Sequence, residues 1–383
     1  MTKTLAFWTL AAVAMWSATL GGCAAKPQPM LLPAAQLAEN QLTVFWKASL
    51  QLNERTRETV RCLYRTPNRI IAMTSDNRLL ALDAFSGRFV WSAELGSPDL
   101  EPTGLDQVGQ AVFVGLLDKL FIFSAEDGSL VARRDLKRAP STRPVVSPEY
   151  VYYGTHQGWL QALAMFAGRD SWQRLTHASI TAAPVFDAER LYFANTDGRV
   201  FAASAVSREP AWEFQTNAAV VADLKLTGQG LVLVASRDYV LYALNPVTGE
   251  VAWMATTGDP LEKAPQVRGG RVFVVKRDGA LMAFEEVTGA RLWTAEGVDR
   301  TLCAGPTTLF VLRPSGTISA LSVASGQEKY RLGPGLVTVV ATNDIDGQLF
   351  IADRHGRVEA VHEAKVRYYL PAGSAAPEAE VAE

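Results

Sequence analysis

Four histidines and three cysteines are the residues of this 383-residue chain best suited to metal binding or nucleophilic chemistry. The histidines are His156, His177, His355 and His362, and no two of them have the spacing of metal ligands. His156 and His355 fall in equivalent turns of a sequence repeat that is described below. We therefore expect turn or surface roles for the histidines, and no catalytic residue, cofactor-binding residue or metal site is predicted.

Two of the cysteines, Cys62 and Cys303, lie 19 and 17 residues before two repeated alanines, Ala81 and Ala320. This spacing places both cysteines on the expected innermost strands of the first and seventh repeats, which are not neighbours. A disulfide between them remains open but is geometrically demanding. We favour the interpretation that both are buried free thiols.

Charged residues gather at two kinds of position. Aspartates recur in one hairpin turn of the repeat, where aspartate binds its own backbone, so no calcium site is expected at Asp76, Asp118, Asp197, Asp238 and Asp278. A basic cluster lies between the second and third repeats and comprises Arg133, Arg134, Lys137, Arg138 and Arg143. It is either a solvated loop or a patch for an acidic partner. The formal net charge of −2 gives no support to nucleic-acid binding.

A repeat of about 40 residues must position these side chains. Seven copies carry an alanine within a hydrophobic run, and Ile122 fills this position in the remaining copy; the alanines are Ala81, Ala162, Ala202, Ala243, Ala283, Ala320 and Ala360. Several short strands in each copy at this period predict an all-β fold, an eight-bladed β-propeller with four antiparallel strands per blade. In the third copy, the expected strands cover residues 143–146, 150–155, 159–165 and 171–175.

Aromatic residues and glycines recur at fixed distances from the repeated alanine. Ten residues after it, six copies carry Trp91, Trp172, Trp212, Trp253, Trp293 and Tyr330, and six residues after it, six copies carry Gly87, Gly128, Gly168, Gly249, Gly289 and Gly326. Folding the hairpin sets Ala243 opposite Trp253, so that the indole can lie flat against the next blade. The six aromatic side chains are therefore predicted to dock blade to blade, and truncation to alanine should cost roughly 3–5 kcal/mol.

Closure of the ring has two possible solutions. Residues 43–47 read as a fourth strand with Trp46 in the aromatic position, although no blade precedes them. Residues 365–370 offer the last copy a fourth strand of its own, but Val366 replaces its turn glycine. An N-terminal strand that completes the last blade would remove an exposed edge, and this is the closure we predict.

The first residues form a targeting segment. A short cationic start and an apolar stretch at residues 5–20 indicate a signal peptide. The following Leu20-Gly21-Gly22-Cys23 resembles the lipobox of bacterial lipoproteins, which implies that Cys23 carries the lipid. Ala24 after the cysteine implies, by resemblance to known sorting rules, the periplasmic face of the outer membrane of a Gram-negative bacterium. The alternatives are an ordinary secretory signal and a membrane anchor, for which the run is short.

Composition divides the chain into four parts. Residues 1–22 are the expected signal peptide, and residues 23–41, rich in proline and alanine, are expected to be a lipidated flexible tether. Residues 42–370 form the predicted propeller. Residues 371–383, dominated by alanine, glutamate and proline, are expected to be a disordered tail.

One repeat carries a recognisable family pattern. The Ala-x-Asp-x-x-Ser-Gly-x-x-x-Trp sequence that runs from Ala81 to Trp91 resembles the repeat of pyrroloquinoline-quinone-type propellers. Eight such repeats behind a lipobox resemble the propeller lipoproteins of the outer-membrane β-barrel assembly machinery, the BamB family, over residues 42–361. The resemblance implies a non-enzymatic scaffold, monomeric within a complex, that binds a periplasmic domain of the barrel-forming subunit and needs no cofactor.

In that family, a connection between blades docks the barrel-forming subunit through a Leu-x-Leu-Arg run. The corresponding residues 177–181 lack the second leucine and the arginine, and an acidic pair in the next connection is reduced to Asp223. Connections 177–183 and 217–224 follow consecutive blades and should lie side by side. We expect Ile180, Val220 and Val221 to offer apolar contacts there, Asp223 to offer a charge, and Arg138 to steer an acidic partner.

Two other functions stay open. The first is a quinone-dependent periplasmic dehydrogenase on the same kind of propeller, although such enzymes are typically longer and often carry adjacent cysteines, which this chain lacks. The second is a periplasmic module that binds peptidoglycan or another glycan. Exposed aromatic residues at one mouth of the ring would favour a glycan, but the aromatic residues counted above occupy docking positions.

Overall fold

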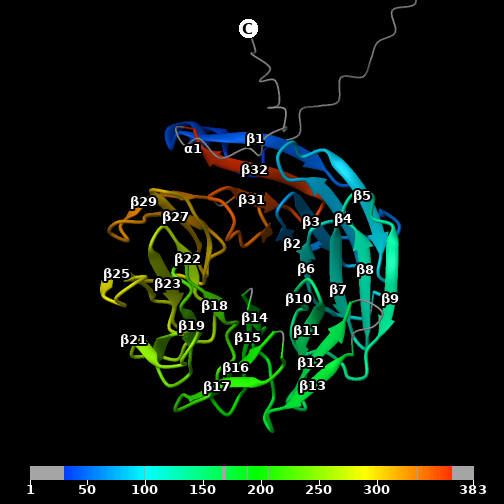
Figure 1. Ribbon diagram of the computed structural model, residues 1–383. Coiled ribbons are helices and arrows are strands. Elements are labelled where there is room, and N and C mark those ends of the chain that lie inside the picture. The colour runs from blue at the N-terminus through cyan, green and yellow to red at the C-terminus, as the bar shows by residue number, and fades with distance from the viewer. Residues whose placement is uncertain are drawn as a thin grey trace, which may run out of the picture. The chain divides into compact units, whose positions relative to one another are not determined.

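The computed structural model describes residues 30–364 except 99, 166–169, 188, 206 and 334. In these residues, eight four-stranded antiparallel sheets follow one another around a ring (Figure 1). The predicted fold class, an eight-bladed all-β propeller, is confirmed. The predicted signal peptide and Cys23 lie outside the described residues, as do the expected tail and the alternative closing strand at 365–370.

Each blade runs from an innermost to an outermost strand. Blades 1 to 4 comprise, in this order, β2 (Val60–Arg65), β3 (Arg69–Thr74), β4 (Arg78–Asp83) and β5 (Phe89–Glu94); β6 (Pro102–Val108), β7 (Ala111–Leu116), β8 (Lys119–Ser124) and β9 (Leu130–Asp135); β10 (Val145–Val146), β11 (Tyr150–Gly154), β12 (Trp159–Ala164) and β13 (Trp172–Leu175); β14 (Val185–Phe186), β15 (Arg190–Ala194), β16 (Arg199–Ser204) and β17 (Pro210–Gln215).

Blades 5 to 8 repeat the pattern. They comprise β18 (Lys225–Leu226), β19 (Val232–Ala235), β20 (Val240–Leu244) and β21 (Val251–Thr256); β22 (Gln266–Arg268), β23 (Arg271–Val275), β24 (Leu281–Glu285) and β25 (Arg291–Ala295); β26 (Arg300–Ala304), β27 (Thr308–Leu312), β28 (Ile318–Ser322) and β29 (Glu328–Leu332); β30 (Val339–Val340), β31 (Leu349–Ala352), β32 (Arg357–Glu363) and β1 (Leu42–Ser49).

The hydrophobic core lies between the blades. The two middle strands of a blade are buried on both faces, because a neighbouring blade covers each side, and they therefore read as continuous apolar runs. One cluster, for example, joins Leu241 and Ala243 of blade 5 to Val272 and Phe284 of blade 6. The outermost strands are covered much less, and in β9 five of six residues are exposed.

Five junctions between blades share one geometry. The repeated alanine pairs with the tryptophan of the outermost strand, as Ala243 does with Trp253. The indole lies over a glycine of the next blade and donates from Nε1 to a main-chain carbonyl beside it, 2.9–3.0 Å away. The pairs are Trp46 with Gly87, Trp91 with Gly128, Trp212 with Gly249, Trp253 with Gly289, and Trp293 with Gly326.

Trp172 departs from this geometry. Arg208 takes the glycine position of blade 4 with a φ of 66°, and it donates a 2.9 Å hydrogen bond to the Tyr150 hydroxyl. The Trp172 indole contacts the rings of Tyr150 and Tyr152 instead, and its Nε1 has no hydrogen-bond partner among the described residues. Tyr330, in the aromatic position of blade 7, is half-buried and pairs with Ala320.

The N-terminal strand closes the ring, as predicted. β1 pairs with β32 and becomes the outermost strand of blade 8 (Figure 1). Trp46 of β1 then docks on blade 1 like the other tryptophans, since its Nε1 donates to the Ala84 carbonyl at 3.0 Å. Two segments that are far apart in the sequence are thereby joined in one sheet, and β32 is paired on both sides, with β31 and with β1.

The expected flexible tether at residues 23–41 is wrong for residues 31–41. Leu31 and Leu32 are fully buried, and the short helix α1 (Ala34–Glu39) leads into β1. The Leu31 amide donates to the Glu359 carboxylate at 3.2 Å, and the Leu31 carbonyl accepts from the Leu336 amide at 2.9 Å. The apolar side chains of this proline- and alanine-rich segment are buried against the propeller. The free energy gained by this burial outweighs the conformational entropy that a free tether would keep.

A loop of blade 8, residues 341–348, reaches into the middle of the ring. Asp346 forms an ion pair with the buried Arg65 of blade 1 at 2.9 Å. Asp344 binds Lys225 of blade 5 and accepts from Gln266 of blade 6 at 2.9 Å. Because these partners belong to blades far apart in the ring, the loop ties opposite sides of the propeller together.

Candidate partner-binding face

One face of the propeller carries all the connections between blades, and we call it the connection face. Each connection starts beside the middle hairpin turn of its own blade and continues to that of the next blade. The Thr176 amide donates to Gly158 of blade 3, and Ser179 accepts from the Thr196 amide of blade 4, both at 2.8 Å. These hydrogen bonds fix the connections to the strands, so this face holds its loops in a defined arrangement.

A threonine at the same position of the repeat begins each of three successive connections. The hydroxyls of Thr176, Thr216 and Thr257 each lie within 3.0 Å of two carbonyl oxygens, one in the preceding hairpin and one in the connection. All three threonines are buried. They are structural residues that shape the connection face.

Ile180 and Val220 do not form the contact surface that the sequence indicated. Both side chains are 0% exposed, and they belong to the cores between blades. A signal in the sequence could have revealed this, because an apolar residue follows the connection threonine at the fourth position in three repeats, as Ile180, Val220 and Leu261. A position that is apolar in three successive repeats indicates a core residue.

Asp223 is also engaged within the protein. One carboxylate oxygen accepts from the Ala183 amide at 2.7 Å, and the other lies 3.3 Å from Nε of Arg143. The side chains of Asp223 and Arg143 are each 34% exposed. The two predicted connections therefore do lie side by side, and Asp223 joins them to the preceding connection by an ion pair.

Arg138 contacts the outer strands of blade 3 and not the connection that carries Asp223. Its guanidinium stacks on the Trp159 ring, 4.4 Å from the centroid, and donates to Gln173 at 3.0 Å. Both partners are in the outer half of blade 3. Among the described residues, no hydrogen bond or ion pair joins Arg138 to Asp223, so the structure does not bring these two predicted residues together.

The side chains that the two connections expose to solvent therefore differ from those that the sequence indicated. His177 and Asn217 point to solvent at the start of each connection. Tyr239, in the hairpin turn of blade 5, is 49% exposed, and the neighbouring Asp238 accepts from the Asn217 amide at 2.9 Å. The sequence did not indicate Tyr239. Nothing in the sequence shows that the hairpin turn carrying this residue lies on the same face as the connections.

A hollow of about 420 Å³ lies next to this region. Val221 and Asp223 line it together with Glu262, Lys263 and Asp299 from the two following connections. Lys263 and Asp299 pair at 3.1 Å, and Glu262 pairs with Arg237 at 2.9 Å. The hollow is therefore lined by charges that neutralise one another, which favours a polar contact surface over an apolar ligand pocket.

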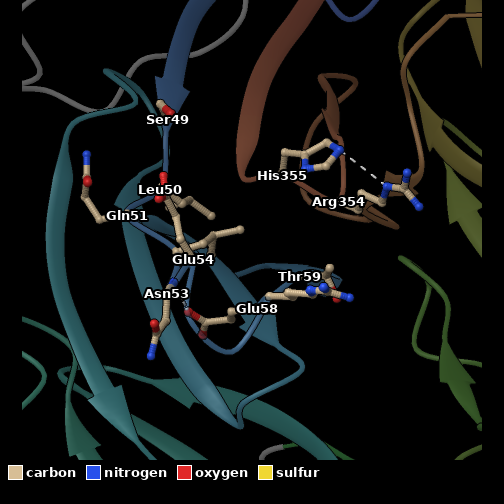
Figure 2. A pocket seen from close by; sticks show the side chains of 11 residues that line it. Ser49, Leu50, Gln51, Asn53, Glu54, Glu58, Thr59, Arg354 and His355 are labelled. Atoms are coloured by element: carbon tan, nitrogen blue, oxygen red, sulfur yellow. Dashed lines mark hydrogen bonds between the residues drawn. The ribbon is translucent and has the colours of Figure 1, made fainter.

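A larger hollow of about 770 Å³ lies where the ring closes. Figure 2 shows the connection after β1, residues 49–59, on one side and the turn with Arg354 and His355 on the other. Glu58 is buried there and satisfied, because it accepts from the Asn53 amide at 2.8 Å and pairs with Arg78 at 2.7 Å. The carboxylate thus organises the connection and is not free for catalysis.

The described residues do not fit a metal-bound quinone. Among them, no three histidine, cysteine, aspartate or glutamate side chains gather where they could hold a metal ion. Asp344 and Asp346, which lie inside the ring, are engaged with Lys225 and Arg65. Each of these two carboxylates is therefore already paired with a basic side chain.

Both cysteines within the propeller are free thiols. Cys303 is fully buried, and burial raises its pKa well above the usual value. Cys62 is half-buried, and burial raises its pKa too. Both thiols are therefore held in the protonated, unreactive form.

In the part of the chain that the structure describes, no helix is long and apolar enough to cross a membrane.

Sequence searches find no significant match among curated proteins. Among solved structures, the crystal structure of BamB from Moraxella catarrhalis is similar, with 18% identity, a TM-score of 0.68, and coverage of 86% of this chain and 99% of that chain.

Two further solved structures share the fold. The computationally designed Ika8 protein has 16% identity, a TM-score of 0.64, and coverage of 83% of this chain and 98% of that chain. The C-terminal WD40 domain of Sif2 has 11% identity, a TM-score of 0.66, and coverage of 84% and 97%. At these identities the structures establish the propeller alone, since propellers host many functions.

The sequence model of one family covers the whole propeller. The model described as "Outer membrane protein assembly factor BamB" matches residues 39–214 and 197–376. The two matched segments include all eight blades and the strand that closes the ring. This chain therefore belongs to the BamB family of outer membrane protein assembly factors.

Proposed function

We propose that this protein is a non-enzymatic lipoprotein scaffold on the periplasmic face of the outer membrane, where it assists the assembly of β-barrel proteins by binding the barrel-forming subunit. The observation that carries the proposal is the match of the family model over residues 39–376. A ring of interlocked blades suits this role, because rigid strands hold the binding loops in fixed relation to one another.

The connection face around blades 4 and 5 is the docking surface in this proposal. Its exposed side chains include His177, Asn217 and Tyr239, and half-buried Val221 borders the adjacent hollow. Tyrosine is well suited to such a surface, since it offers a large apolar area and a hydroxyl at low entropic cost. Asp223 contributes by holding the connections in place through Ala183 and Arg143.

Site-specific photo-crosslinking in cells tests this surface. A photoreactive amino acid placed at 177, 217 or 239 should crosslink to the barrel-forming subunit. The matched controls are Val247 and Val287, which are 59% and 57% exposed in the outer hairpin turns at the opposite face. Crosslinks to that subunit from the control positions alone, or from no position, would contradict the proposed docking surface.

The lipid anchor at Cys23 is part of the same proposal. The docked segment begins at Leu31, so only seven residues, 24–30, separate it from the lipidated cysteine. Seven residues span at most roughly 25 Å. A lipid at Cys23 would therefore keep the propeller close to the bilayer, and more than one acyl chain is needed for stable attachment.

The absence of enzymatic activity is likewise proposed and is open to direct test. Calorimetric titration of the protein with pyrroloquinoline quinone in the presence of calcium should give no stoichiometric heat. The proposal rests on the carboxylates inside the ring being engaged by Lys225 and Arg65. Saturable one-to-one binding of the quinone would overturn the scaffold assignment in favour of a dehydrogenase.

A further inference from the structure

Blade 3 is flanked by two junctions that lack the regular pairing of tryptophan and glycine. At the junction of blades 2 and 3, Ala132 stands in the tryptophan position and pairs with Ile122. At the junction of blades 3 and 4, Arg208 stands in the glycine position, and the Trp172 indole N–H has no partner among the described residues. These two departures are consecutive in the ring, so blade 3 lacks the regular docking on both sides.

Each of these junctions has a groove on its outer side. The groove between blades 2 and 3 measures about 270 Å³, and Leu136, Tyr153, Leu163 and Trp172 form its apolar lining. The groove between blades 3 and 4 measures about 400 Å³, and Leu175, Phe201 and Trp212 line it, with Trp212 at the position equivalent to Trp172. The outer rim of blade 3, which we define as these two grooves with β9 and β13, therefore offers two adjacent sites for large apolar side chains.

β9 is the exposed edge of blade 2 beside the first groove. It pairs with β8 on one side only, so the main-chain groups on its other side are open to a further strand. Leu130 and Val131 in this strand are 55% and 64% exposed. An extended peptide could add to this edge and place every second side chain towards the blade.

The charge of the rim points to an acidic partner. Arg133, Arg134 and Lys137 are exposed and Arg174 is half-buried. Among the described residues, no ion pair joins any of these four to a carboxylate. The acidic residues beside them are occupied, since Asp135 binds Lys119 at 3.2 Å and Glu213 lies 3.7 Å from Arg199.

We propose that the outer rim of blade 3 binds an extended, acidic segment of another polypeptide, which pairs with the edge of β9 and inserts an aromatic side chain into the groove between blades 2 and 3. The aromatic residue takes the place of the tryptophan that Ala132 lacks. The rim is separate from the connection face, so this site goes beyond the docking of the barrel-forming subunit. The exposed cations hold the acidic residues on either side of the aromatic anchor.

Binding of a synthetic peptide to the full-length protein in detergent tests the proposal. The probe is Glu-Thr-Val-Trp-Val-Asp-Glu with a fluorescein at its N-terminus, and binding is followed by the anisotropy of the fluorescein or by calorimetry. Two control peptides replace tryptophan by alanine or the acidic residues by lysine. Each replacement should weaken binding at least about tenfold, and raising salt from about 50 to 500 mM should weaken binding of the parent peptide.

Two variants of the protein locate the site. I122A/A132W restores the small–large pair of the regular blades and should fill the groove with the protein's own indole. R133E/R134E reverses the charge of the rim. Each should weaken peptide binding at least about tenfold with an unchanged circular dichroism spectrum. The matched controls are L292W and R88E/R291E, which make similar changes at exposed residues of other blades, and these should bind like the wild type.

Several results would overturn the proposal. One is the absence of saturable binding by the parent peptide, and another is equally tight binding of the peptide without tryptophan, which would reveal a general attraction for polyanions. If I122A/A132W does not fold, R133E/R134E decides the matter, because exposed arginines are tolerant of change. Wild-type affinity in R133E/R134E would place the peptide elsewhere on the protein.

Discussion

Gly289→Ala should destabilise the propeller far more than Gly230→Ala, although both glycines have similar backbone conformations. Their φ angles are +70° and +82°, so alanine in either position costs about 1–2 kcal/mol for the left-handed conformation. A Cβ at Gly230 meets nothing within 4 Å. A Cβ at Gly289 would lie 2.4 Å from Cε3 of Trp253, which is closer than any real contact between carbon atoms.

The indole has little room to yield. Trp253 is 7% exposed and donates a 3.0 Å hydrogen bond to the Glu286 carbonyl, so any shift strains both the packing and that bond. Overpacking of this kind costs about 1–3 kcal/mol, and the hydrogen bond adds about 1 kcal/mol. Gly289→Ala should therefore lower the free energy of unfolding by roughly 3–6 kcal/mol, compared with roughly 1–2 kcal/mol for Gly230→Ala.

Thermal and urea unfolding of the single variants and of Gly289→Ala combined with Trp253→Ala form a double-mutant cycle. For a domain of this size, about 1 kcal/mol corresponds to roughly 1–2 °C in Tm. Trp253→Ala alone should cost about 3–5 kcal/mol. In its background, Gly289→Ala should cost no more than Gly230→Ala, because the indole is gone. Equal shifts for both glycine variants in the wild type, or an additive cycle, would refute docking of the indole on the glycine.

Three further predictions concern other parts of the molecule. Asp346→Ala should cost about 3–5 kcal/mol, because it leaves the Arg65 guanidinium, 1% exposed, without its ion pair; urea unfolding measures this, and a shift below about 0.5 kcal/mol would contradict it. Burial raises the pKa of Tyr153 to about 12, so its contribution to stability is present below about pH 10 and is lost as the pH rises through about 12. Tyr153→Phe should therefore flatten the fall of stability with pH in this window, and an unchanged slope in denaturant titrations would show that Tyr153 does not titrate there. Cys23→Ser should release a folded protein from the membrane fraction, whereas retention of the variant, together with no palmitate labelling of the wild type, would contradict the lipid anchor.

The repeat explains why the fold was accessible from the sequence. Each copy places a small residue and an aromatic residue ten positions apart, and the hairpin between them sets the two side chains opposite each other, as in Ala243 and Trp253. This local regularity determined the strands to within a few residues and identified β1 as the closing strand. Periodic, short-range patterns of this kind are the most dependable signal in a sequence.

The contacts of the connections and of the N-terminal segment were less accessible, because they depend on distant parts of the chain. Ile180 and Val220 stand in segments without strand periodicity, and their burial follows only from the stacking of neighbouring blades. Leu31 and Leu32 stand among prolines and alanines, and the groove that buries them is built by residues about 300 positions later. Asp344 in the ring binds a lysine 119 positions earlier, which no local pattern encodes.

The central claim is that the connection face binds the barrel-forming subunit, and calorimetry with two purified proteins tests it most directly. The full-length protein in detergent is titrated with the periplasmic region of the barrel-forming subunit from the same organism. We predict saturable one-to-one binding that is lost in H177E/N217R/Y239D, whose three positions are exposed on the connection face, and kept in V247D/V287D at the opposite face. No heat of binding with the wild type, or equal affinity in both variants, would contradict it.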